Sequence, residues 1–100
     1  RDLVLLDEPL GALDSLTRAE LQLWLAEVLT LQQTTVLFVT HDVEEAIVLG
    51  DRIVVLSPRP GSVCLDVSVP LARPRQREML FDPMFLAIRR EVLGALGIPI

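Results

Sequence analysis

Two adjacent carboxylates follow a short apolar run near the start of the chain. The run extends from Leu3 to Leu6, and Asp7 and Glu8 come directly after it. In open parallel sheets, ligands bind beyond the carboxyl ends of the strands, so both side chains are expected at a binding edge. There Asp7 can hold Mg²⁺, usually through water, and Glu8 can polarise a water molecule for attack on a phosphate.

The single histidine of the chain comes at the end of a second apolar run. His41 follows residues 36–40, which are rich in β-branched and aromatic side chains and predict a buried strand. If this strand is parallel to the first, His41 and Asp7 lie at the same edge of the sheet. A histidine at this spacing can be an ordinary surface or core residue, and that interpretation stays open. The functional alternative is a contact to the γ-phosphate, by donating to a phosphate oxygen or by orienting the attacking water.

The apolar runs and turn signals predict alternating strands and helices, which indicates an α/β domain with a parallel core. Pro9 is expected to keep Glu8 extended, because proline disfavours the helical conformation at the preceding residue. Asp42, with Glu45 three residues later, predicts a capping-box start for a short helix. The expected strands are 3–6, 36–40, 51–57 and 62–69. The expected helices are one that Asp14 or Ser15 caps and that runs to about residue 32, one at 43–49 and one at 83–96. Turns are expected at 10–14 and 58–61, and 70–77 is expected to be irregular.

Two further sets of side chains have both a structural and a functional interpretation. Trp24 shares helical spacing with neighbouring leucine and valine residues, so it is interpreted as a packing residue rather than a base-stacking one. Arg73, Arg75 and Arg77 alternate ahead of the last predicted helix. They are interpreted as a solvated linker rather than as a site for phosphate or acidic lipid.

Charge and hydropathy restrict the class of protein. The 100 residues carry a formal net charge of −5, and all 9 basic residues are arginine. An acidic chain lacks the footprint of a nucleic-acid binder, so no nucleic-acid partner is predicted. Hydrophobic residues make up 51%, but they occur in runs far shorter than the roughly 18 residues of a membrane-spanning helix. Such runs are typical of strands covered on both faces, and part of that cover is expected in sequence outside this chain.

The longer motifs resemble the ATP-binding subunit of ABC transporters. They are LLDEPLGALD at 5–14, TVLFVTHDVEEA at 35–46 and DRIVVLSPRPG at 51–61, and the resemblance covers essentially the whole chain. It implies a P-loop NTPase-like ABC ATPase domain, represented by its C-terminal part from the Walker B strand onward. Residues 1–69 would belong to that domain, with parallel strands, helices and a hairpin. Residues 70–100 would form a linker and the C-terminal helix of the same subunit.

Four residues match the functional positions of this family. Asp7 matches the Walker B aspartate, Glu8 the catalytic glutamate, Asp14 the D-loop aspartate and His41 the switch histidine. The resemblance therefore implies catalytic roles for Glu8 and His41, contacts to ATP from Asp7, Asp14 and His41, and Mg²⁺ binding by Asp7. The Walker A loop, the glutamine loop and the signature motif do not occur in these 100 residues. Because the Walker A loop supplies most direct phosphate contacts, the chain alone is expected neither to bind ATP tightly nor to hydrolyse it.

The resemblance also implies a function and a set of partners. The motifs DSLTR at 14–18 and HDVEEA at 41–46 are similar to those of the nitrate, sulfonate and taurine importer branch. The implied protein is an ATP hydrolase bound peripherally to the cytoplasmic face of a bacterial inner membrane. Its partners would be a second ATPase subunit in a head-to-tail dimer, transmembrane permease subunits and, indirectly, a periplasmic solute-binding protein. Two alternatives stay open: an ABC-type ATPase of DNA repair or translation, and a truncated, non-catalytic remnant with exposed apolar surface.

Overall fold

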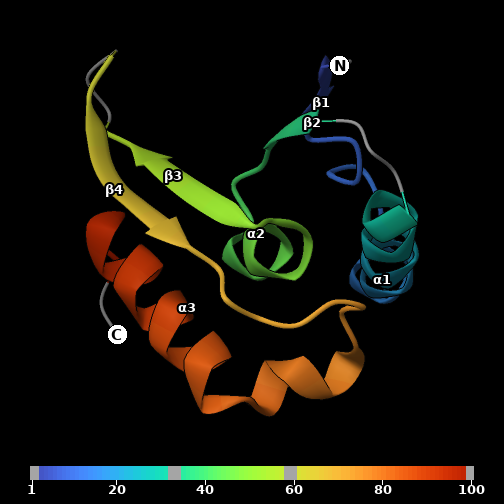
Figure 1. Cartoon of the computed structure of the whole chain (residues 1–100). Coiled ribbons are helices and arrows are strands. Elements are labelled where there is room, and N and C mark those ends of the chain that lie inside the picture. Colours follow the sequence, from blue (N-terminus) through green and yellow to red (C-terminus); the bar gives the residue numbers. More distant parts are fainter. Residues whose placement is uncertain (1–2, 32–34, 58–60, 99–100) are drawn as a thin grey trace.

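The computed structural model describes residues 3–31, 35–57 and 61–98 (Figure 1). Its elements are β1 (Leu3–Asp7), α1 (Ser15–Leu31), β2 (Thr35–Val39), α2 (Val43–Leu49), β3 (Arg52–Leu56), β4 (Val63–Ser68), the 3-10 helix η1 (Arg77–Phe81) and α3 (Pro83–Ala95). Each predicted strand and helix is present, with bounds within one residue of those expected, whereas η1 was not predicted. The predicted turn at 58–61 lies outside the described residues except for Gly61, and so does residue 32, the expected end of the first helix.

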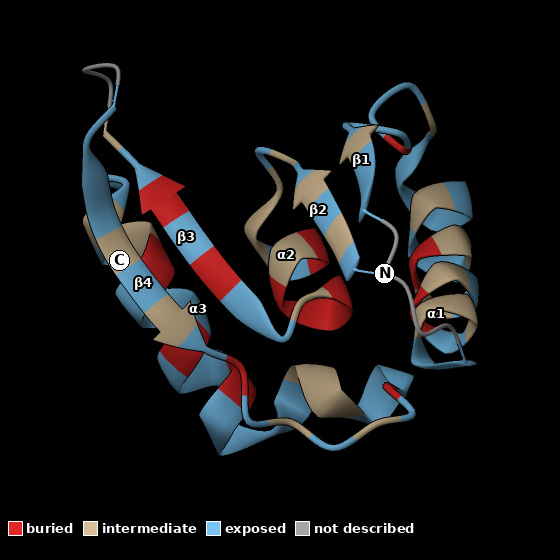
Figure 2. Ribbon diagram, turned by 45° about the horizontal axis from the view of Figure 1, so that its top comes forward, coloured by how far each residue is buried: buried red, intermediate tan, exposed pale blue. Residues whose placement is uncertain are grey.

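The strands form two separate two-stranded sheets. β1 and β2 are parallel, with Asp7 opposite Val39 at their carboxyl ends. β3 and β4 are antiparallel and form the predicted hairpin. Figures 1 and 2 show α2 between the two sheets, with α1 on the side of β1 and β2 and with α3 beside the hairpin. The expected parallel core is therefore present as the β1–β2 pair, and β3 belongs to the other sheet.

Most side chains of the buried core come from α2, β3 and α3 (Figure 2). Phe85 and Ile47 are its largest fully buried side chains, with 1% and 0% of their surface exposed. On α3, the buried positions are spaced three and four residues apart, so they share the helix face that meets the core. The buried members of the core are Ala26, Ile47, Val48, Leu49, Ile53, Val55, Val69, Phe85, Ile88 and Val92.

The side chains of β1 and β2 are much more exposed than those of the core. Leu3 is 69% exposed, Leu5 62% and Leu37 57%. Cover on both faces was expected for these strands, and the described residues do not supply it. Nor do the described ranges contain a helix long and apolar enough to cross a membrane.

The packing face of α1 differs from the predicted one. Trp24 is 60% exposed, so its interpretation as a packing residue is wrong for the described chain. The buried residues of α1 are instead Gln22 and Ala26. At about 100° per residue, Trp24 points away from both of them, and the face that they share is turned toward α2.

Both ends of α2 have defined caps. Asp42 is the N-cap, and its Oδ1 accepts from the Glu45 backbone N at 3.2 Å, as predicted. The reciprocal half of the capping box does not form, because Glu45 is buried and its Oε2 accepts from Gln22 Nε2 at 3.1 Å. At the other end, the Gly50 N–H donates to Ala46 O at 2.9 Å. The helix that follows the His41 loop is therefore held at its first and last turns.

Candidate active site at the ends of β1 and β2

Glu8 and His41 meet at the carboxyl ends of the parallel strands. The Glu8 N–H donates to Val39 O at 2.7 Å, which extends the strand pairing by one residue. The imidazole Nδ1 of His41 contacts Glu8 Oε1. Because a carboxylate can only accept, the proton of this hydrogen bond lies on Nδ1. Both side chains face solvent, with 81% of the His41 side chain and 43% of the Glu8 side chain exposed.

The backbone of Glu8 adopts a left-handed conformation with φ +48°, so the prediction that this residue is extended is wrong. Pro9 favours the extended region at Glu8, but the chain reverses direction here and overrides that local preference. This reversal lets the Glu8 N–H bond to β2 while its carbonyl accepts from the Gly11 N–H at 3.1 Å. Positive φ is uncommon outside glycine, and such conformations concentrate at functional sites.

Asp7 ends β1 and exposes its carboxylate next to Glu8. Among the described residues, no group of three or more His, Cys, Asp or Glu side chains could hold a metal ion. Mg²⁺ in nucleotide sites usually keeps several waters and takes one or two protein carboxylates together with phosphate oxygens. Asp7 offers one carboxylate at this edge, and its oxygens are the type of ligand that such coordination uses.

Asp14 lies at the other end of the turn, immediately before α1. Its Oδ2 accepts from the Thr17 backbone N at 3.4 Å, in the manner of an N-cap. Hydrogen bonds from Thr17 lower the pKa of the Asp14 carboxyl, because they stabilise its ionised form. Within the described residues this carboxylate bonds to the first turn of α1 rather than to Glu8 or His41.

Arg18 connects the turn after β1 with the residue after His41, and no prediction assigned it to the site. Its Nη2 donates to Leu13 O at 3.0 Å and lies 3.5 Å from Gly11 O, while Nη1 lies 3.4 Å from Asp42 Oδ2. The sequence does carry a signal for this role. Arg18 is in the first turn of α1, where the helix dipole disfavours a positive charge, so it requires negatively polarised partners nearby.

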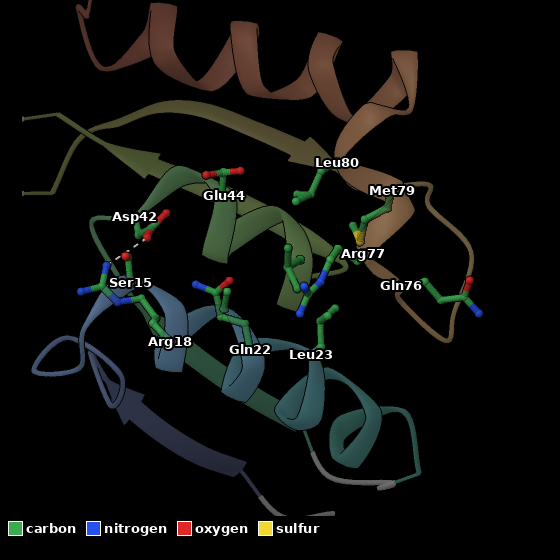
Figure 3. Close-up of a pocket in the computed structure, with 12 residues that line it drawn as sticks. Ser15, Arg18, Gln22, Leu23, Asp42, Glu44, Gln76, Arg77, Met79 and Leu80 are labelled. Carbon is green, nitrogen blue, oxygen red and sulfur yellow. Dashed lines mark hydrogen bonds and ion pairs between the residues drawn. The ribbon is translucent and has the colours of Figure 1, made fainter.

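A cavity of about 350 Å³ adjoins the site between α1, α2 and η1 (Figure 3). Figure 3 shows Arg18 and Asp42 at one end of this cavity and Gln76 at the other. The residues that line it do not include Glu8 or His41. The cavity therefore includes Arg18 and Asp42 in its wall, but it is separate from the edge where the two candidate catalytic side chains meet.

Arg73 and Arg75 bind the C-terminal end of α2, so their interpretation as a solvated linker is wrong. Arg75 Nη1 donates to Ile47 O at 2.7 Å, and its Nη2 donates to Gly50 O at 3.1 Å. Arg73 Nη2 donates to Leu49 O at 2.7 Å. The last carbonyls of a helix lack intrahelical partners and carry partial negative charge, which favours guanidinium groups there. Only the third arginine of the series is exposed as predicted.

Asp51 completes this cluster. Its Oδ1 lies 3.0 Å from Arg73 Nε and 3.6 Å from Arg75 Nη2, and the Arg75 side chain is 1% exposed. Burial, and secondarily the charge of Arg73, lower the pKa of the Arg75 guanidinium, whereas Asp51 opposes this shift. An arginine nevertheless stays charged in proteins, so the segment before η1 is bound to the end of α2 by charged hydrogen bonds.

Known proteins similar to the chain include ATP-binding import proteins, although no protein-family model matches it. The aliphatic sulfonates import ATP-binding protein SsuB 1 of Frankia alni is 50% identical over 97 residues, covering 97% of this chain and 34% of that protein. SsuB 2 of Burkholderia lata is 44% identical over 94 residues, covering 94% and 33%. The taurine import ATP-binding protein TauB of Jannaschia sp. is 40% identical over 97 residues, covering 93% and 36%.

The chain thus spans about a third of the length of the curated relatives that it matches. Over nearly its whole length, it is homologous to ATP-binding import subunits of ABC transporters of the sulfonate and taurine type.

Proposed function

We propose that this chain is the part of an ABC importer's ATP-hydrolysing subunit that carries the Walker B strand, the D-loop and the switch histidine. The observation that supports this most strongly is the contact of Glu8 with His41 beside Asp7, at the carboxyl edge of a parallel strand pair. Relatives 40% to 50% identical are named as import ATP-binding proteins. Residues 1–69 would belong to the ATPase domain, and residues 70–100 would form its linker and C-terminal helix.

Glu8 and His41 would together orient and activate the attacking water. The Glu8 carboxylate can accept a hydrogen bond from water and polarise it for in-line attack on the γ-phosphate. With Nδ1 donating to Glu8, Nε2 of a neutral His41 ring would accept from the same water, whereas a protonated ring would donate to a phosphate oxygen. The contact between the two side chains therefore supports a joint role.

Asp7 and Asp14 would serve the nucleotide rather than the attacking water. Asp7 would hold Mg²⁺ through water, and the ion when bound would neutralise charge on the phosphates. Hydrogen bonds from Thr17 stabilise the ionised form of Asp14, which would present its charge on the turn that faces the second subunit of a head-to-tail dimer. The proposed partners also include transmembrane permease subunits and, through them, a solute-binding protein. The subunit would act at the cytoplasmic face of the inner membrane.

The test begins with the coding sequence upstream of Arg1. We expect an open frame that encodes a G-x-x-x-x-G-K-S/T loop and a signature motif, and we expect the complete subunit to release phosphate from ATP when Mg²⁺ is present. A stop codon that closes the frame immediately upstream would contradict the proposal in favour of a non-catalytic remnant. A complete subunit whose activity required nucleic acid would favour the alternative in DNA repair or translation.

A further inference from the structure

We infer that Arg18 is a positioning residue that holds the turn after Glu8 and the link that contains His41 and Asp42 in one fixed relation. Its effect on turnover rests on the proposed function, whereas its effect on the geometry of the two loops does not. Glu8 and His41 come from strand ends that are far apart in sequence: Glu8 begins the turn between β1 and α1, and His41 lies in the short link between β2 and α2. A contact that joins these two segments controls how the two side chains meet.

The guanidinium group of Arg18 makes this connection with its two terminal nitrogens. Nη2 donates to Leu13 O at 3.0 Å, in the turn that starts at Glu8. Nη1 lies 3.4 Å from Asp42 Oδ2, on the residue that follows His41. The side chains of Arg18 and Asp42 are only 27% and 28% exposed, so solvent screens this ion pair less than it screens a fully exposed one.

Asp42 transmits the contact to His41 because its own position is fixed on three sides. Its Oδ1 caps α2 by accepting from Glu45 N at 3.2 Å, and its N–H donates to Thr40 Oγ1 at 3.0 Å. Its remaining carboxylate oxygen, Oδ2, is the one that Arg18 contacts. His41 therefore lies between Thr40 and Asp42, which are joined to each other by a hydrogen bond, and Arg18 links Asp42 to the turn after β1.

Arginine suits this position better than lysine for a geometric reason. Two nitrogens of a planar fork can bind a carbonyl and a carboxylate at the same time, whereas an ammonium offers a single nitrogen. Arg18 Nε is buried without a hydrogen-bond partner among the described residues, so the group acts through its terminal nitrogens. The unfavourable placement of a cation in the first turn of α1 is offset by these contacts.

The kinetic test compares four single variants and one double variant of the complete subunit with the wild type. Arg18→Met removes the fork, Arg18→Lys keeps the charge, and Asp42→Asn keeps the Oδ1 cap but loses the ionic partner. The matched control is Arg52→Met, which breaks a bidentate pair with Asp66 on the hairpin, at 2.8 and 2.6 Å. We expect Arg18→Met to lower kcat by about tenfold or more with KM for ATP changed by less than about twofold, as for an interaction made in the transition state.

Further expectations separate positioning from simple stabilisation. Arg18→Lys should recover only part of kcat, and the double variant Arg18→Met/Asp42→Asn should be no slower than Arg18→Met, because both changes remove the same contact. Arg52→Met should keep wild-type kcat. An unchanged kcat in Arg18→Met, fully additive effects in the double variant, or an equal loss in Arg52→Met would overturn the inference.

Amide hydrogen exchange gives a readout that does not depend on ATP hydrolysis. Arg18→Met should speed exchange at residues 10–14 and 41–43 together, while Arg52→Met leaves both segments unchanged. Faster exchange in only one segment, or throughout the protein, would assign Arg18 an ordinary structural role. If the wild-type subunit does not hydrolyse ATP, the proposed function fails, and this comparison still decides whether Arg18 couples the two loops.

Discussion

His41 Nδ1 donates a hydrogen bond to Glu8 Oε1 although the two residues are 33 positions apart in the chain. The parallel pairing of β1 with β2 is the reason, since it brings both strand ends to one edge and places Asp7 opposite Val39. The left-handed turn at Glu8 then presents its carboxylate at the same edge. The pairing of the two strands and the reversal of the backbone at Glu8 therefore form the candidate site. The residues next to Glu8 or to His41 in the sequence could not form it by themselves.

Nucleotide binding by the chain alone is the first prediction. We expect the 100 residues, purified by themselves, to show no micromolar affinity for ATP in isothermal calorimetry, because the Walker A loop, which supplies most direct phosphate contacts, does not occur in them. The complete subunit, titrated under the same conditions with Mg²⁺, is the comparison. Micromolar binding by the chain alone would contradict this prediction.

Arg75 is expected to be important for stability. Replacing it with Met leaves the carbonyls of Ile47 and Gly50 without their charged donor in a buried setting. We expect a loss of about 2–4 kcal/mol in the free energy of unfolding, measured by urea denaturation. Arg77→Met, an exposed change in the same segment, serves as control and should cost less than about 0.5 kcal/mol. Equal effects of the two substitutions would refute the assignment.

Gly50 and Gly94 provide a matched pair of glycine substitutions. A Cβ at Gly50 would lie 2.8 Å from Ala46 O, a backbone atom that cannot easily move, whereas a Cβ at Gly94 meets nothing within 4 Å. Gly50→Ala should therefore destabilise the protein by about 1–3 kcal/mol. Gly94→Ala, within α3, should stabilise it by about 0.5–1 kcal/mol because alanine is the better helix former. Thermal unfolding shows whether each substitution lowers or raises stability. A Gly50→Ala variant as stable as the wild type would contradict the close approach of a Cβ to Ala46 O.

The Arg52–Asp66 pair is expected to make the stability of the protein depend slightly on pH in the acidic range. Hydrogen bonding and charge from Arg52 lower the pKa of the Asp66 carboxyl in the folded chain. The contribution of this pair to the free energy of unfolding is therefore complete above the pKa of Asp66 in the unfolded chain, about 3.9. It is lost as the pH falls through the lower pKa of Asp66 in the folded chain. Urea denaturation between neutral and acidic pH should show a weaker loss of stability below about pH 4 in Asp66→Asn than in the wild type. Identical pH profiles would mean that the pair contributes nothing measurable.

Local signals in the sequence account for the elements and for part of the site. The cap at Asp42 and the hairpin after β3 follow from short motifs, and each forms as predicted apart from the reciprocal bond of Glu45. The partners of Arg75, and the Asp42 partner of Arg18, lie 24 or more positions away in the chain, so only tertiary packing determines these contacts. The same applies to Trp24, whose helical spacing cannot show which face of α1 meets α2.

The most direct test of the account is the turnover of Glu8→Gln in the complete subunit. Glutamine can still accept from His41 Nδ1 through its side-chain oxygen, but it cannot take a proton from water. We expect phosphate release to fall by about 10²–10⁴-fold while ATP affinity, measured by calorimetry, stays the same. Phosphate release at the wild-type rate in this variant would contradict the catalytic role of Glu8 and with it the proposed site.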